Sequence, residues 1–147
     1  MSDGLVFPNP RSCLFDLIDG AEHLGKSVSA HYQEPADELG YLQGPFPVAV
    51  IYAMPGGSEG YVDRVDRMAI DVFAPGELAV DTLESIKASI CGDSIETPSG
   101  YLDSIRPDQV PTDIPYTSDT LNKATATFLL TSRPLWTPTG EPLTTKP

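Results

Sequence analysis

The clearest hydrophobic pattern in the chain is a strand that leads directly into an amphipathic helix. From Arg64 to Phe73 the residues alternate, with Met68, Ile70 and Val72 on one side and Arg67, Ala69, Asp71 and Phe73 on the other. Pro75 then begins a stretch in which apolar residues recur at helical spacing up to Ile90. The apolar stripe of this predicted helix consists of Ala79, Leu83, Ile86 and Ile90, and Gly92 is the predicted terminator.

The N-terminal part predicts a helix, an edge strand and a more buried strand. Asn9 and Pro10 are typical of a helix start, and the apolar spacing extends this helix from Pro10 to Leu24. Ser27 to Tyr32 is short and rich in β-formers, which predicts an edge strand. Polar residues 33–44 predict a loop, and Phe46 to Ala53 is apolar on both faces, as expected of a central strand. Residues 54–60 are glycine-rich and predict a flexible connection.

The C-terminal part predicts a hairpin, a loop, a long strand and a tail. Residues 94–105 carry apolar positions around a Pro98-Ser99-Gly100 turn, which predicts a small hairpin or a bent strand, and the prolines of residues 106–118 indicate a loop. Thr120 to Thr131 alternates, with Ala124, Ala126, Phe128 and Leu130 on one side. Residues 134–147 are rich in proline and threonine and contain too few apolar residues to offset the entropy of ordering.

These elements predict an α+β fold with the order α-β-β-β-α-β-β. Residues 1–133 form a single predicted domain, with helices packed on one face of a mixed or antiparallel sheet, and residues 134–147 form a C-terminal tail.

The charge of the chain argues against tight binding to nucleic acid. Twenty-one acidic and nine basic residues give a net charge of −12, which repels a phosphate backbone. The first ten residues have neither a basic segment nor an apolar one, and no long apolar run occurs, so we expect a soluble protein that is not exported.

Candidate chemistry in the sequence is sparse. Cys13 and Cys91 both fall on apolar faces of predicted helices, which favours buried free thiols over a disulfide. Two cysteines and two histidines without paired spacing do not predict a zinc site, and nothing predicts another cofactor.

One short motif matches an enzyme signature. Gly56-Gly57-Ser58-Glu59-Gly60 fits the G-x-S-x-G pattern of esterases, but a predicted strand follows it where a helix is needed. His23 and His31 both precede Ser58, contrary to the order of the hydrolase triad, so we expect no enzyme activity.

Charged side chains on the predicted strands offer a second kind of site. Asp63, Asp66 and Asp71 suggest a cation site or an acid-base pair, but the interleaved arginines favour a solvated, ion-paired sheet face. Such a face, with the loops and the tail, suits contact with other chains. The candidate residues for a subunit interface, a tube interface or the lining of a central hole are Glu59, Tyr61, Arg64, Arg67, Asp71, Arg106 and Trp136.

Two segments give the chain a resemblance to a known family. Residues 64–74 (RVDRMAIDVFA) lead into a helix ending in residues 86–90 (IKASI), and the later strand at residues 124–130 reads ATATFLL. This pattern resembles the tail-terminator proteins of long-tailed bacteriophages, particularly those that infect actinobacteria, and it extends from about Ser12 to Arg133.

The resemblance implies a virion protein with no catalytic residues, assembled in the host cytoplasm. Six subunits would form a ring that caps the tail tube, stops polymerisation of the tube protein and joins the head connector. DNA would pass through the ring without specific binding. The alternatives are a stopper or head-closure protein, a tail-tube subunit, an acidic binding module or DNA mimic, and a small serine esterase using Ser58.

Overall fold

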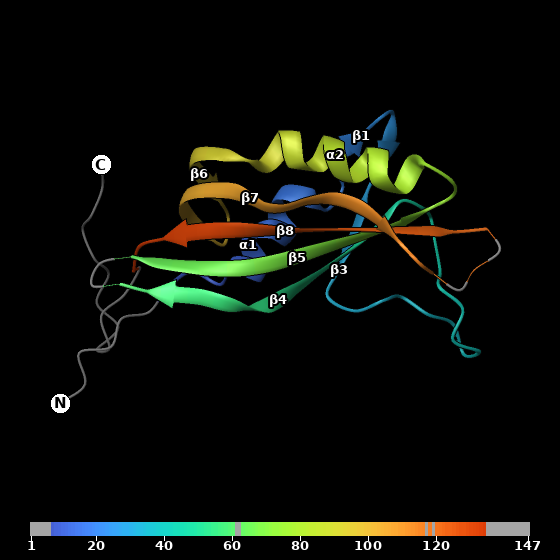
Figure 1. Ribbon diagram of the computed structural model, residues 1–147, viewed down its shortest axis with the longest axis horizontal. Coiled ribbons are helices and arrows are strands. Elements are labelled where there is room, and N and C mark those ends of the chain that lie inside the picture. Colours follow the sequence, from blue (N-terminus) through green and yellow to red (C-terminus); the bar gives the residue numbers. More distant parts are fainter. Residues whose placement is uncertain (1–6, 61–62, 117, 119, 135–147) are drawn as a thin grey trace.

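A curled six-stranded sheet and two helices form the protein in the computed structural model, which describes residues 7–60, 63–116, 118 and 120–134 (Figure 1). In chain order, the elements are α1 (Pro10–Ile18), β1 (Glu22–His23), β2 (Lys26–Ser27), β3 (Ser29–His31), β4 (Val48–Glu59), β5 (Arg64–Ala74), α2 (Leu78–Ile90), β6 (Gly92–Thr97), β7 (Gly100–Ile114) and β8 (Asn122–Ser132). The fold class is therefore α+β, as predicted. The element order is longer than predicted, since β1 and β2 add a hairpin and the segment of residues 94–105 lies in two strands.

The predicted strand Arg64 to Phe73 is central in the sheet. The strand order is β3-β4-β5-β8-β7-β6, and β5 pairs with β4 on one side and with β8 on the other. β3 runs parallel to β4, whereas every other neighbouring pair in this sheet is antiparallel, so the sheet is mixed. The predicted edge strand near Ser27 to Tyr32 is confirmed in position but shortened to β3.

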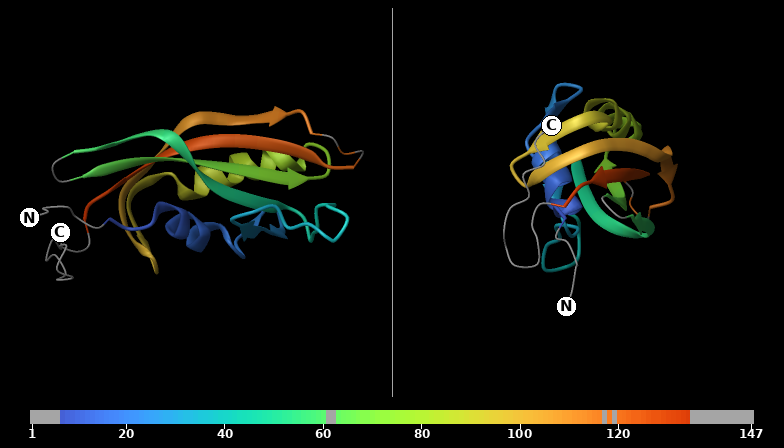
Figure 2. Two further views of the ribbon diagram at one scale, coloured as in Figure 1. Left: turned by 90° about the horizontal axis from the view of Figure 1, so that it is seen from below. Right: turned by 90° about the vertical axis from the view of Figure 1, so that its left-hand side faces the viewer.

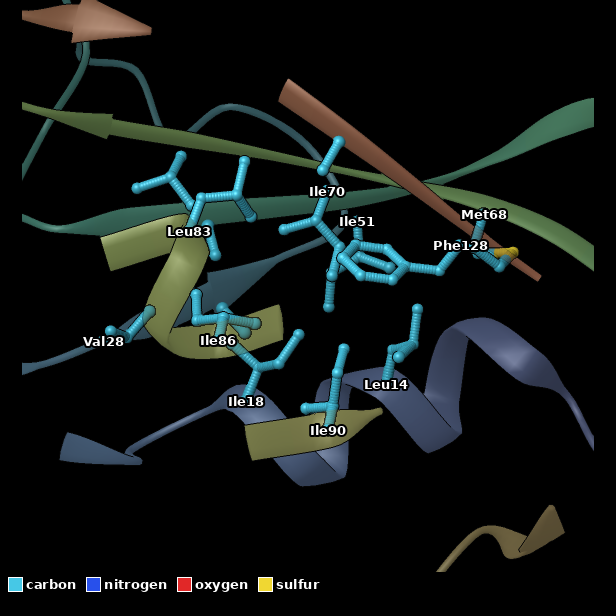
Figure 3. Close-up of a cluster of buried hydrophobic side chains, with 14 of the residues drawn as sticks. Leu14, Ile18, Val28, Ile51, Met68, Ile70, Leu83, Ile86, Ile90 and Phe128 are labelled. Atoms are coloured by element: carbon cyan, nitrogen blue, oxygen red, sulfur yellow. The ribbon is translucent and has the colours of Figure 1, made fainter. Parts of the chain in front are cut away.

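The apolar side of β5 faces the main core, as the alternation predicted. Met68, Ile70 and Val72 lie in one buried cluster with the predicted apolar side of β8. The helix side chains of this cluster include Leu14 and Ile18 from α1 and Leu83, Ile86 and Ile90 from α2 (Figure 3). The predicted stripe of α2 is thus confirmed.

The opposite side of β5 forms a second, smaller cluster at one end of the sheet. Phe73 packs there with Val48 and Val50 of β4, and partly buried side chains close over them. These covering residues are Leu42, Phe46, Tyr52 and Tyr116. Both sides of β5 are therefore buried near its C-terminal end.

The predicted first helix was too long. Asn9 caps it as predicted, because its side chain accepts hydrogen bonds from the amides of Arg11 and Ser12. The helix ends at Ile18, since Asp19 is extended and its carboxylate accepts a hydrogen bond from the amide of Ala30. Residues 22–27 instead form the β1–β2 hairpin, whose turn places Leu24 in solvent.

The predicted flexible connection at residues 54–60 was wrong for most of its length. β4 continues to Glu59 and forms a long hairpin with β5, with a bulge between Met54 and Ser58. Gly57 permits this bulge, because a Cβ atom there would collide with the carbonyl oxygen of Val65.

The predicted loop at residues 106–118 was also wrong in its first part. β7 continues to Ile114 and pairs with β8, with bulges between Pro107 and Thr112. β6 pairs with β7 only up to Ile105, so the prolines lie where β7 forms the edge of the sheet. Proline is tolerated at such edges and bulges because no second strand needs its missing amide proton.

Two predicted boundaries shift near the second helix. α2 begins at Leu78, after Pro75, and ends at Ile90, where Cys91 adopts an extended conformation. Gly92 therefore begins β6 and is not the helix terminator. Of the two alternatives predicted around residues 98–100, the structure has the hairpin, formed by β6 and β7. The predicted tail lies outside the described residues from position 135 onward.

The core predicts unequal effects for two leucine substitutions. Leu83 is fully buried, so Leu83→Ala should lower the free energy of unfolding by about 2–5 kcal/mol through lost contacts and a cavity. Leu39 is 81% exposed, and Leu39→Ala should change it by less than about 0.5 kcal/mol. Urea denaturation of both variants tests this, and equal losses would contradict the described core.

Candidate assembly surface

Two of the candidate residues lie together near the tip of the β4–β5 hairpin. Glu59 and Arg64 are register partners, with 4.0 Å between the Arg64 Nη1 and the Glu59 Oε1 atoms. The Arg64 Nε atom also donates a hydrogen bond of 3.1 Å to Asp66. The side chains of Glu59 and Arg64 are 60% and 42% exposed, so this pair contributes little to stability and is accessible to a partner. Tyr61 lies outside the described residues.

Hydrogen bonds around Arg67 connect four strands on the side of the sheet that faces away from the main core. Its Nε atom donates a hydrogen bond of 2.8 Å to Asp108 on β7, and its Nη1 atom donates one of 3.4 Å to the carbonyl oxygen of Pro55 on β4. The hydroxyl of Thr127 on β8 also donates to Asp108, at 2.9 Å. The sequence did not single out Asp108, because it lies in the segment that was predicted to be a loop.

Asp71 lies inside its own chain and not on a solvated face. It is 6% exposed, and its Oδ1 atom accepts hydrogen bonds from the hydroxyls of Tyr52 at 3.1 Å and Thr125 at 2.6 Å. The ammonium group of Lys123 lies 3.6 Å from the other oxygen. Burial and then the negative charge of Asp71 raise the pKa of Tyr52, so this hydroxyl stays protonated as a donor. The predicted solvated face is wrong at this position.

The remaining candidates are dispersed. Arg106 forms an exposed ion pair with Asp93 across the β6–β7 hairpin. Trp136 lies outside the described residues. The described candidates therefore divide between the hairpin tip, the network of Arg67, the buried network of Asp71 and the far edge of the sheet.

The geometry does not assemble a serine triad around Ser58. Ser58 lies within β4 opposite Val65, and a strand follows it, as the sequence indicated. His23 hydrogen-bonds to Ser85 at 2.8 Å through Nδ1, and His31 to Ser29 at 2.6 Å through Nε2. Both described histidines are thus engaged with serines other than Ser58.

The two cysteines are free thiols, as predicted. Cys13 is buried and Cys91 is partly buried, and burial raises the pKa of each thiol. Both therefore favour the protonated, unreactive form. Within the described ranges, no three His, Cys, Asp or Glu side chains gather so that they could hold a metal ion.

Besides the edge strands β3 and β6, a stretch of β4 and a stretch of β7 have a neighbouring strand on only one side. β4 has β3 beside it only from Val48 to Val50, and β7 has β6 beside it only up to Ile105. Most of the residues in the remaining stretches, 51–59 and 106–114, are exposed or half-buried. Pro55, Pro107 and Pro111 interrupt these edges, and prolines and bulges are the usual protection against pairing with another chain. Contacts between subunits are therefore expected to use side chains and loops.

In the part of the chain that the structure describes, no helix is both long enough and apolar enough to cross a membrane.

Comparison of the sequence with models of protein families and with curated proteins finds no match.

Removal of the buried carboxylate of Asp71 should lower the free energy of unfolding. Asp71→Ala leaves the hydroxyls of Tyr52 and Thr125 and the charge of Lys123 without their partner, so the free energy of unfolding should fall by about 1–3 kcal/mol. Asp113→Ala, at an exposed position of β7, should change it by less than about 0.5 kcal/mol. Urea denaturation measures both, and a neutral Asp71→Ala would show that the network contributes nothing.

The buried ring of His23 should make the stability of the protein depend on pH. The ring is 6% exposed, its Nε2 atom has no hydrogen-bond partner, and burial lowers the pKa of His23 from its ordinary value of 6.5. The unfolded chain therefore takes up this proton first as pH falls, so stability is complete above about 6.5 and is lost below it.

His23→Asn should reduce this loss. Thermal unfolding at neutral pH and in mild acid measures the loss for wild type and variant. An equally large loss in both would show that other groups cause it.

Proposed function

We propose that this chain is a structural assembly subunit of a bacteriophage virion and not an enzyme. In the proposed role it is the tail terminator: copies form a hexameric ring that caps the tail tube and ends polymerisation of the tube protein. The opposite face of the ring contacts the head connector. The protein is assembled in the host cytoplasm and resides in the neck region of the virion.

The observation that carries this proposal is the arrangement of the segments on which the resemblance depends. β5 leads through a short connection into α2, β8 pairs with β5 over its full length, and side chains from all three lie in one core cluster. The similar segments thus form a single structural unit. The proposal itself rests on the resemblance of these segments in sequence.

The surface also supports assembly over chemistry. The ion-paired β4–β5 hairpin and the exposed large apolar residues are features that suit contact with other chains. The described histidines and thiols are engaged or buried. An esterase that uses Ser58 would need a general base, which the geometry around Ser58 does not provide.

The net charge of −12 suits a ring through which DNA passes, because like charges keep the genome from adhering to the wall. The same charge is compatible with an acidic binding module or DNA mimic. A stopper, a head-closure protein and a tail-tube subunit are alternatives within the class of assembly proteins. Each of these alternatives is compatible with the proposal that both helices pack on one face of the sheet. The core cluster supports this proposal because it contains side chains from both helices.

Electron microscopy of the purified protein tests the proposal. Rings with sixfold symmetry are expected, either for the protein alone or after addition of the tail-tube protein, because heterologous contacts close a ring. A compact monomer under both conditions would rule out the assembly role.

Deletion of the gene from an assembling phage distinguishes the neck proteins. Loss of a terminator should give tubes of uncontrolled length, because nothing stops addition of tube protein. Tails of normal length that lack heads would identify a stopper instead.

A further inference from the structure

The β1–β2 hairpin is attached to the helix beside it through a single buried side chain. Of residues 22–27 only His23 is buried, and the other five are exposed to solvent. The hairpin lies beside α2 (Figures 1 and 2), and the His23 Nδ1 atom lies 2.8 Å from the hydroxyl oxygen of Ser85 on that helix. Docking of the hairpin on α2 therefore depends on one imidazole ring.

The base of the hairpin is closed by backbone hydrogen bonds that do not involve this ring. The amide of Gly20 donates a bond of 2.8 Å to the carbonyl oxygen of Val28, and the amide of Val28 donates one of 2.9 Å to the carbonyl oxygen of Ala21. The side chains of Val28 and Ala30 belong to the main core cluster. Residues 22–27 can therefore move away from α2 while the base and the core stay in place.

The hairpin has little stability of its own. Each of its strands has two residues, and an isolated two-stranded hairpin is marginally stable at best in water. Its turn has φ angles of 56° at Leu24 and 78° at Gly25, and this left-handed conformation is unfavourable for leucine. Opening the hairpin therefore needs less free energy than unfolding the core.

The surroundings of the His23 ring favour its neutral form. The Nε2 atom is buried and has no hydrogen-bond partner among the described residues. The charged groups on the elements around the ring are Asp19, Glu22, Lys26, Asp81, Glu84 and Lys87. Glu84 pairs with Lys87 at 3.0 Å and Asp19 accepts a bond from the amide of Ala30, and no described carboxylate forms an ion pair with the ring. A protonated ring would place a charged N–H group in this buried position without an acceptor, which costs free energy.

We propose that the β1–β2 hairpin is a pH-sensitive latch on α2, which is closed while His23 is neutral and opens when the ring is protonated. Opening transfers the charged ring to water and uncovers the hydroxyl of Ser85. Because opening needs less free energy than unfolding, the hairpin opens in mild acid while the core stays folded. The latch requires neither a ring of subunits nor a phage partner, so it is independent of the proposed function.

Proton linkage gives the direction and the pH range of the opening. In the open hairpin the ring has its ordinary pKa of about 6.5, whereas burial lowers the pKa of His23 in the closed hairpin. The closed state is thus fully favoured above about pH 6.5 and is weakened as the pH falls below this value. The equilibrium constant for opening should rise by up to about tenfold per pH unit in this range.

Hydrogen exchange of single amides, measured by NMR spectroscopy on the full-length chain at about pH 7.5 and about pH 5.5, tests the latch. Protection factors correct for the effect of pH on intrinsic exchange. They should fall about tenfold at the amides of the register pair His23 and Lys26, because an undocked hairpin frays. The amides of Val28 and of β5 should keep their protection. Nuclear Overhauser contacts between the His23 ring and α2 should weaken over the same range.

Two matched variants identify the titrating group. His23→Asn has a side chain that does not titrate in this range, so the protection of its hairpin, whether high or low, should be equal at the two pH values. His31→Asn removes the other histidine, which lies on β3 and is bonded to Ser29, and it should keep the wild-type response.

Three results would overturn the latch. Unchanged hairpin protection and ring contacts in mild acid would show that the hairpin does not open. A parallel loss of protection in β5 would show that the whole domain unfolds and that the hairpin is not a separate unit. A response that persists in His23→Asn would assign the opening to another group.

Discussion

The fold depends on the burial of one face of β5 against the core cluster that includes side chains of both helices. β4 and β8 flank this strand, and Met68, Ile70 and Val72 face a cluster that also takes in the apolar stripes of both helices. Neither helix would be stable alone in water, because short helices need an apolar surface to pack against. β5 supplies this surface.

The second face of the sheet has a different physical basis. Near Phe73 it is closed by apolar side chains, and farther along it is held by polar networks centred on Asp71 and on Asp108. A buried carboxylate is stable only when donors satisfy it, and strands that are far apart in the sequence supply those donors. Hydrogen bonds between side chains of different strands therefore connect this face. The same face lines a hollow beside the C-terminal half of β7.

The free stretches of β4 and β7 are protected against pairing with another chain. Prolines and bulges along the free stretches of β4 and β7 discourage strand pairing, which would join copies without limit. An assembly of defined size needs contacts with a fixed geometry instead.

Local pattern alone determined the α+β class, the alternation of β5 and β8, the stripe of α2 and the cap of α1. These features depend on side-chain spacing and on residues close in the sequence, so the sequence alone shows them. The local pattern did not determine the end of α1, where Asp19 accepts a hydrogen bond from Ala30. It also did not determine the extension of β4 and β7 through glycines and prolines. Only pairing with distant strands makes those segments regular.

The same division applies to the candidate surface. The sequence singled out Arg67 and Asp71 but not their partners Asp108, Tyr52 and Thr125, because these contacts span strands that are distant in the chain. It could not show that Asp71 is buried, or that residues 33–44 are ordered around Asp37. Tertiary structure decided both, since burial and hydrogen bonding depend on which strands and loops meet in space.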